Sequence, residues 1–267
     1  PLHYLPISMK DRNSGDFTMV YGFPGRTEQH VSSTYLEQII TKERPARIRM
    51  RDLSLSVIDK AMKNSELIRI QYASKQARIS NAWKKWIGQI DGLKRLDAVQ
   101  IKIERETKYE EMANSKKEWQ DLYGNVIKGL NVLAKDQFKY EFMYSMGIEY
   151  FYVGPEYFKL IRSTNDLINN YDKYEEKNQL DSIKTSIIKA SEGFFKNYNL
   201  NIDKEVFTLL TNEYVLQTKN QGLSIKTIIN SDNIFDKSVF TDKVRYQNFL
   251  KKFNKKCSKK LMKDPGY

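Results

Sequence analysis

A chain of 267 residues with 40% hydrophobic content is long enough to bury a sizeable core, as one large or two small domains. Pro occupies only 6 positions and Gly 12, too few for a protein made of many short strands and turns, so the composition favours helices. The net charge of +12 could attract nucleic acid, anionic lipid or acidic peptides, but no run approaches the roughly 20 apolar residues of a membrane span.

Two β-rich runs in the first thirty-odd residues predict a hairpin. They cover residues 5–9 and 17–23 and are separated by a polar turn that contains Gly15, and Pro24-Gly25 ends the second run. Because an isolated hairpin is only marginally stable, we expect these strands to belong to a sheet whose other members lie outside the chain. The chain begins with Pro1 rather than an initiator Met, so we expect it to be part of a longer protein.

The signals are helical from about Ser33 onward. Ser33-Thr34 with Glu37 resembles a capping box that opens a helix through about residue 42, and Pro45 is expected to separate this helix from the next. Asp203 is expected to cap its own helix, and Gly88 and Gly92 to weaken theirs. Further helices are predicted over residues 47–63, from 66 through the tryptophan pair, and over 93–115, 119–144, 156–177, 181–197, 202–219 and 242–263. Short polar breaks between such long helices predict antiparallel helical hairpins in a bundle.

The segment around Asn81 has two different faces if it is helical. At about 100° per residue, one face forms an apolar stripe suited to burial, made of Ile79, Trp83, Trp86 and Ile90. Asn81 points the opposite way, together with small residues and with lysines at the margins: Ser74, Ala77, Gly88, Lys84 and Lys85. The stripe is predicted to anchor the helix, and the Asn81 face is predicted to bind a polar group.

No catalytic or metal-binding constellation is predicted within the chain. The two histidines are His3 and His30, and neither belongs to a recognisable triad or to a paired-His zinc motif. The lone Cys257 excludes an internal disulfide and a thiol cluster for zinc. No motif for a cofactor is found. Four acids alternate with basic residues at helical spacing, which favours a solvated helix face: Glu104, Glu106, Glu110 and Glu111.

The basic charge has one dense block near the C-terminus, which we interpret as a solvated helix face: Lys251, Lys252, Lys255, Lys256, Lys259, Lys260 and Lys263. The alternative hypothesis is a basic helical interaction or nucleic-acid-binding domain that uses this block. It predicts binding that weakens steeply with salt. A third hypothesis is a structural bundle without a ligand.

Three ordered segments carry a resemblance to a known family. They are Gly15–Thr27, Tyr72–Lys75 and Asn81–Gly88, read as GDFTMVYGFPGRT, YASK and NAWKKWIG, and the short segment Leu5–Ser8, read as LPIS, precedes them. In this order and spacing they resemble the S46 family of bacterial serine dipeptidyl aminopeptidases, and the likeness extends over the whole chain. Members of that family join a chymotrypsin-like double β-barrel to a large inserted helical domain that caps the active-site cleft.

The resemblance implies a mainly α chain with two parts. Residues 1–33 would be a β-hairpin segment from the catalytic barrel, and residues 34–267 would be the helical cap. The catalytic triad would lie outside the chain, so the chain alone is expected to be inactive. The implied partners are peptide substrates with a free N-terminus and the rest of the same polypeptide, and a homodimer of the full-length protein is compatible with the family. The resemblance also implies a periplasmic location and no nucleic-acid partner.

The resemblance assigns one binding residue. In the family, the asparagine of the N-x-W-K-K-W segment helps to bind the free α-amino group of the substrate, and this position is Asn81 here. The chemistry is reasonable, because an amide oxygen accepts hydrogen bonds from an ammonium group. Ala82 and His30 stand where relatives often carry an aromatic residue, and neither change is expected to abolish this role. The implied reaction removes dipeptides from peptide N-termini by acyl transfer through a serine.

Overall fold

The structure is a computed structural model that describes residues 7–19, 21, 30–223 and 230–267, and the chain forms two compact units, residues 1–31 and 32–267. The first unit contains a turn in which the Asp16 N–H donates to the carbonyl of Asn13 at 3.2 Å. Gly15 has φ +98°, a left-handed conformation that suits glycine. No strand occurs among the described residues of this unit. Both predicted strands extend outside those residues, so the hairpin stays a prediction.

The second unit is helical, which confirms the mainly α prediction. None of the helices in the described residues is long and apolar enough to cross a membrane. The helices are α1 (Ser33–Gln38), the π-helix η1 (Ile39–Glu43), α2 (Arg44–Asn64), α3 (Glu66–Arg95), α4 (Ala98–Ala113), α5 (Lys117–Tyr123), α6 (Val126–Gly147), the π-helix η2 (Ile148–Val153), α7 (Phe158–Asn169), α8 (Tyr171–Glu176), α9 (Leu180–Lys196), α10 (Leu200–Asn220), α11 (Ser231–Lys237), the 3₁₀-helix η3 (Val239–Thr241), α12 (Lys243–Lys251) and α13 (Cys257–Leu261).

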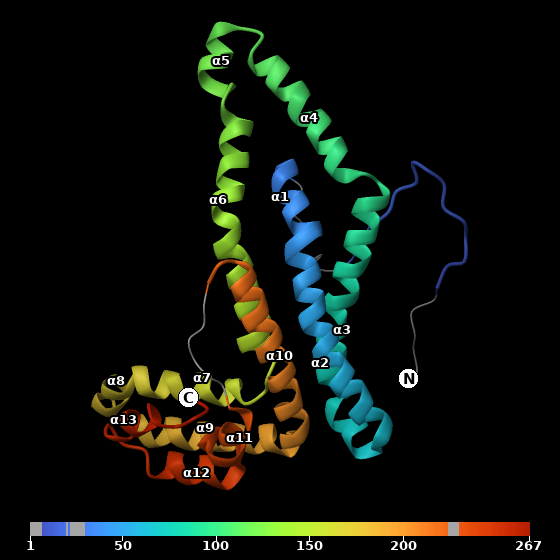
Figure 1. Ribbon diagram of the computed structural model, residues 1–267. Helices are drawn as coiled ribbons and strands as arrows, with labels where there is room; N and C mark the ends of the chain where they lie inside the picture. Colours follow the sequence, from blue (N-terminus) through green and yellow to red (C-terminus); the bar gives the residue numbers. More distant parts are fainter. Residues whose placement is uncertain (1–6, 20, 22–29, 224–229) are drawn as a thin grey trace. The chain divides into compact units, whose positions relative to one another are not determined.

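Long helices pack side by side within this unit. Helices α2 and α3 form an antiparallel pair, and α10 also packs on α2 (Figure 1). Helix α1 contacts both α4 and α6, and the shorter helices α7 to α9 and α11 to α13 gather near one end of α10. A continuous core of apolar and aromatic side chains joins the long and short helices, including Met50, Val57, Phe142, Leu160, Phe207, Leu210, Phe235 and Tyr246.

The first helical run is longer than predicted. It continues from Ser33 to Asn64, so the expected break at Pro45 is wrong. Pro45 lies in the first turn of α2, directly after the π-helical turn η1. We attribute the continuity to this wider turn, because it leaves room for a ring that would otherwise meet the carbonyl four residues earlier.

Other boundaries also differ from the sequence prediction. Ser32, not Ser33, caps α1, and its Oγ accepts from the Tyr35 N–H at 3.2 Å. Helix α3 continues through Gly88 and Gly92 and ends before Asp97, which has φ +47°. The predicted helices over 119–144, 156–177 and 242–263 are each divided in two.

A buried ion-pair cluster joins three helices. The Glu149 side chain, in η2, is fully buried, and its carboxylate accepts from Arg47 Nη2 at 2.7 Å and from Arg51 Nε at 2.8 Å. The Arg44, Arg47 and Arg51 guanidiniums of α2 lie 5.1, 4.2 and 4.5 Å from the ring centroid of Trp86 in α3. Favourable cation–π and ion-pair contacts therefore converge where α2, α3 and η2 meet.

We expect Glu149→Gln to lower the free energy of unfolding by about 3–5 kcal/mol, because the buried Arg51 would lose its counter-charge and the partly buried Arg47 would keep only Glu43 as a partner. Urea denaturation followed by circular dichroism measures this change. Glu66→Gln is the matched control, because Glu66 pairs with Arg69 on the exposed surface of α3, where an ion pair contributes little. Equal stability losses in the two variants would contradict a structural role for the buried cluster.

Candidate functional site

The predicted apolar stripe of α3 is confirmed. Ile79, Trp86 and Ile90 are buried, and Trp83 packs partly buried against the core. The Trp83 indole Nε1–H also donates to Asp52 Oδ1 of α2 at 2.6 Å. Both tryptophans therefore hold α3 against α2, and neither is available to a ligand on the opposite face.

Asn81 lies on the exposed face of α3, as do Ser74, Ala77 and Gly88. A Cβ atom added to Gly88 would meet nothing within 4 Å, so this face has open space beside the backbone. Within the described part of the chain, the Asn81 amide makes no hydrogen bond. Its side chain is therefore free to bind a ligand, and its role in substrate binding stays a prediction.

The other sequence-level candidates do not assemble into a site. His30 is exposed, and His3 lies outside the described residues. Among the described residues, no group of three His, Cys, Asp or Glu side chains could hold a metal ion. The seven lysines of the C-terminal block are exposed, as expected of a solvated face. Glu106 differs from that expectation, because its carboxylate accepts from both the N–H and the Oγ of Ser33 at 2.6 Å.

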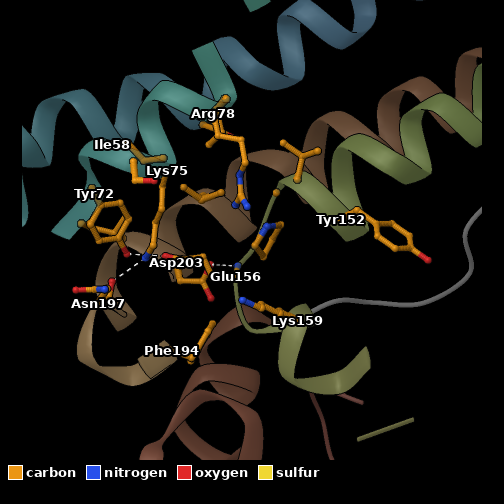
Figure 2. A pocket seen from close by; sticks show the side chains of 18 of the residues that line it. Ile58, Tyr72, Lys75, Arg78, Tyr152, Glu156, Lys159, Phe194, Asn197 and Asp203 are labelled. Carbon is orange, nitrogen blue, oxygen red and sulfur yellow. Dashed lines mark hydrogen bonds and ion pairs between the residues drawn. The ribbon is translucent and has the colours of Figure 1, made fainter. Parts of the chain in front are cut away.

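A cavity of about 680 Å³ lies beside the N-terminal half of α3, and sequence reasoning did not find it (Figure 2). Its wall is formed by α3, by the turn between η2 and α7, and by parts of α7, α9 and α10. Arg78 of α3 lines this cavity. Asn81 follows one helical turn later and does not line it.

A polar network closes one side of the cavity. The Tyr72 hydroxyl of α3 donates to Glu156 Oε1 at 2.8 Å and accepts from the Asn199 N–H at 3.2 Å. Lys75 forms an ion pair with the Glu156 carboxylate and donates to the carbonyl of Asn197 at 2.7 Å. Burial, together with the nearby Glu156 carboxylate, raises the pKa of Tyr72 well above its usual value. The hydroxyl therefore acts as a fixed hydrogen-bond donor.

Asp203 lies at the base of the same network. The sequence predicted that it caps its own helix, which is wrong, because Asn199 caps α10. The Asp203 carboxylate instead accepts from the backbone N–H of Glu156 at 2.5 Å and of Tyr157 at 3.1 Å, just before α7. Burial, and then the Glu156 charge, raise the pKa of Asp203 to about 7. A carboxyl group with this pKa changes its charge near neutral pH.

We expect the raised Asp203 pKa to make stability depend on pH. The folded state binds this proton more tightly than the unfolded state does, so the stabilisation is complete below about pH 4 and is lost as pH rises through about 7. Asp203→Asn cannot ionise, so the variant should lose less stability than the unsubstituted protein between pH 4 and 8. Thermal unfolding across this range measures the difference.

Asp136→Asn is the matched control for that experiment, because Asp136 is an exposed residue of α6. It should leave the pH dependence of the unfolding temperature unchanged. If Asp203→Asn also leaves it unchanged, Asp203 does not titrate in the folded protein at these pH values.

Comparison with known proteins identifies the family. The family model described as Peptidase S46 matches residues 1–267. The chain belongs to the peptidase S46 family. This confirms the resemblance carried by the three ordered sequence segments.

The S46 chain is similar to parts of characterised peptidases. It is 30% identical over 285 residues to an Asp/Glu-specific dipeptidyl-peptidase of Flavobacterium psychrophilum, an alignment that covers 100% of this chain and 38% of the relative. It is 29% identical over 283 residues to dipeptidyl-peptidase 7 of Porphyromonas endodontalis, covering 100% of this chain and 33% of the relative. The chain therefore spans about a third of the length of these relatives.

A solved structure shares the fold. It is the crystal structure of Porphyromonas endodontalis DPP11 in complex with the dipeptide Arg-Glu. The match has a TM-score of 0.66 and 20% sequence identity, and it covers 92% of this chain and 36% of that chain. The helical arrangement of this S46 chain thus occurs within a larger protein of known structure.

Proposed function

We propose that this S46 chain forms the helical cap of a serine-type dipeptidyl-peptidase that releases dipeptides from peptide N-termini. Two relatives that match the whole chain are dipeptidyl-peptidases, and the fold matches about a third of a structure that holds a dipeptide. The catalytic serine, histidine and aspartate belong to a double β-barrel of the same polypeptide and are not among these 267 residues. The family resemblance also supports a periplasmic enzyme.

The exposed Asn81 amide is the observation that carries this proposal. Its oxygen can accept a hydrogen bond from the α-ammonium group of a peptide. The helix that presents Asn81 is 30 residues long and is held by the buried Trp86. A binding group on a rigid element can be positioned more accurately than one on a loop.

Binding of the peptide's α-ammonium group at one fixed position explains why the released product would be a dipeptide. When Asn81 binds the α-ammonium group, the second peptide bond lies at a set distance from it and reaches the serine. The serine oxygen attacks that carbonyl to form an acyl-enzyme, the shortened peptide leaves with its new amino group, and water then releases the dipeptide. A cap over the cleft would also control entry, as lids do in other enzymes.

We expect Asn81→Ala in the full-length enzyme to lower kcat/KM for dipeptide p-nitroanilides with a free amino group by about 10- to 100-fold. This range corresponds to the loss of one hydrogen bond to a charged group. Steady-state kinetics measure it. Circular dichroism should show no change in the folded state, because the side chain is exposed.

Gln89→Ala is the matched control, since Gln89 is an exposed amide of the same helix. It should leave kcat/KM unchanged. A substrate acetylated at its amino group should react poorly with the unsubstituted enzyme and should lose little more with Asn81→Ala. An Asn81→Ala enzyme with full activity on free-amine substrates would refute the assigned role.

We expect the 267-residue chain by itself to show no hydrolysis of the same substrates, because the catalytic groups belong to the barrel. Release of p-nitroaniline at high protein concentration is the measurement. Hydrolysis that persists after inhibition of contaminating proteases would place the catalytic residues within this chain and would contradict its role as a cap.

A further inference from the structure

The cavity beside α3 is lined by more positively charged than negatively charged side chains. Its two acids already have partners, because Glu156 pairs with Lys75 and Asp203 accepts two backbone N–H groups. Lys75 also lies 3.9 Å from the ring centroid of Tyr72, so its ammonium group is fully engaged. Lys75 is therefore the only cation of the cavity, among the described residues, that forms an ion pair with one of its acids.

Two further cations line the same cavity without an acidic partner in the described residues. They are Arg78 of α3 and Lys159 of α7, and both are exposed. Figure 2 shows the two side chains reaching from different helices toward the interior of the cavity. Like charges repel, so such an arrangement costs energy unless solvent or a bound anion screens it.

Arg162 adds a third positive charge to the cavity. Its guanidinium lies 4.6 Å from the ring centroid of Tyr152 and donates to the carbonyl of Phe151. Burial lowers the pKa of Arg162, and no carboxylate among the described residues pairs with it. Its position is thus fixed by an aromatic face and a carbonyl, and its charge remains uncompensated.

We propose that this cavity binds an anionic ligand that carries a carboxylate or phosphate group, held between Arg78 and Lys159. The fork of an arginine can bind such a group through two hydrogen bonds, and a lysine supplies a compact second charge. A volume of about 680 Å³ falls within the usual range for small-molecule sites. This inference does not depend on the proposed peptidase function, because Asn81 lies outside the cavity.

The test measures binding to the full chain directly. Isothermal titration calorimetry uses inorganic phosphate in one series and succinate in another, with ionic strength held constant by sodium chloride. We expect saturable binding of one anion per chain. Tighter binding of phosphate would identify a phosphate ester as the natural ligand class, and tighter binding of succinate would identify a carboxylate.

The variant Arg78→Gln/Lys159→Gln should weaken that binding by about tenfold or more, because two charge-assisted contacts are lost. Both side chains are exposed, so the fold should persist, and thermal unfolding checks this. Lys60→Gln/Lys63→Gln removes the same charge from exposed positions of α2 that do not line the cavity, and it should bind as the unsubstituted protein does. No saturable binding of either anion, or equal weakening in both double variants, would overturn the proposal.

Discussion

The buried carboxylate of Glu149 is the constraint on which the arrangement of the long helices depends. A charge in an apolar interior is tolerated only with partners in good geometry, and Arg47 and Arg51 of α2 provide them. These guanidiniums in turn lie close to the face of Trp86 in α3. The hydrophobic effect is non-directional, whereas paired hydrogen bonds between charged groups fix the positions of the groups that they join. The register of α2, α3 and η2 is therefore set by one acid.

The cluster around Glu149 also positions the two candidate binding sites, the Asn81 face of α3 and the cavity beside α3. Arg51 Nη1 donates to the carbonyl of Ile79 at 2.8 Å, and Ile79 lies between Arg78 and Asn81 in α3. On the other side, η2 leads into the turn at Gly154, where an added Cβ would lie 2.7 Å from Leu210 Cδ1. The same Cβ would lie 2.7 Å from the backbone oxygen of Tyr150, so this tight turn requires glycine. The cavity wall and the Asn81 face thus share one scaffold.

Sequence periodicity predicted which face of α3 is buried, because the spacing of Trp83 and Trp86 is a local property. It could not predict the roles of Glu149 and Asp203. Their partners lie 98 residues away for Arg51 and 47 for Glu156, and an acid in a sequence is by default assigned to the surface. Nor could it predict the cavity, whose cations come from separate helices. The role proposed for Asn81 comes from family resemblance, since periodicity predicts that this residue is exposed but not what it binds.

The 30-residue helix α3 carries both Arg78 of the cavity and Asn81, so the two candidate binding sites are close enough for their charges to interact. Arg78 and Asn81 are three residues apart, a rise of about 4.5 Å along the helix axis. An ammonium group bound at Asn81 would lie near the positive charges of Arg78, Lys84 and Lys85, which are exposed on the same helix. Interactions between charges, both repulsive and attractive, are stronger near a protein surface than in bulk water. If the cavity binds an anion and Asn81 binds a peptide amino terminus, as proposed, an anion held at Arg78 would reduce the repulsion at Asn81 and would favour binding of that amino terminus.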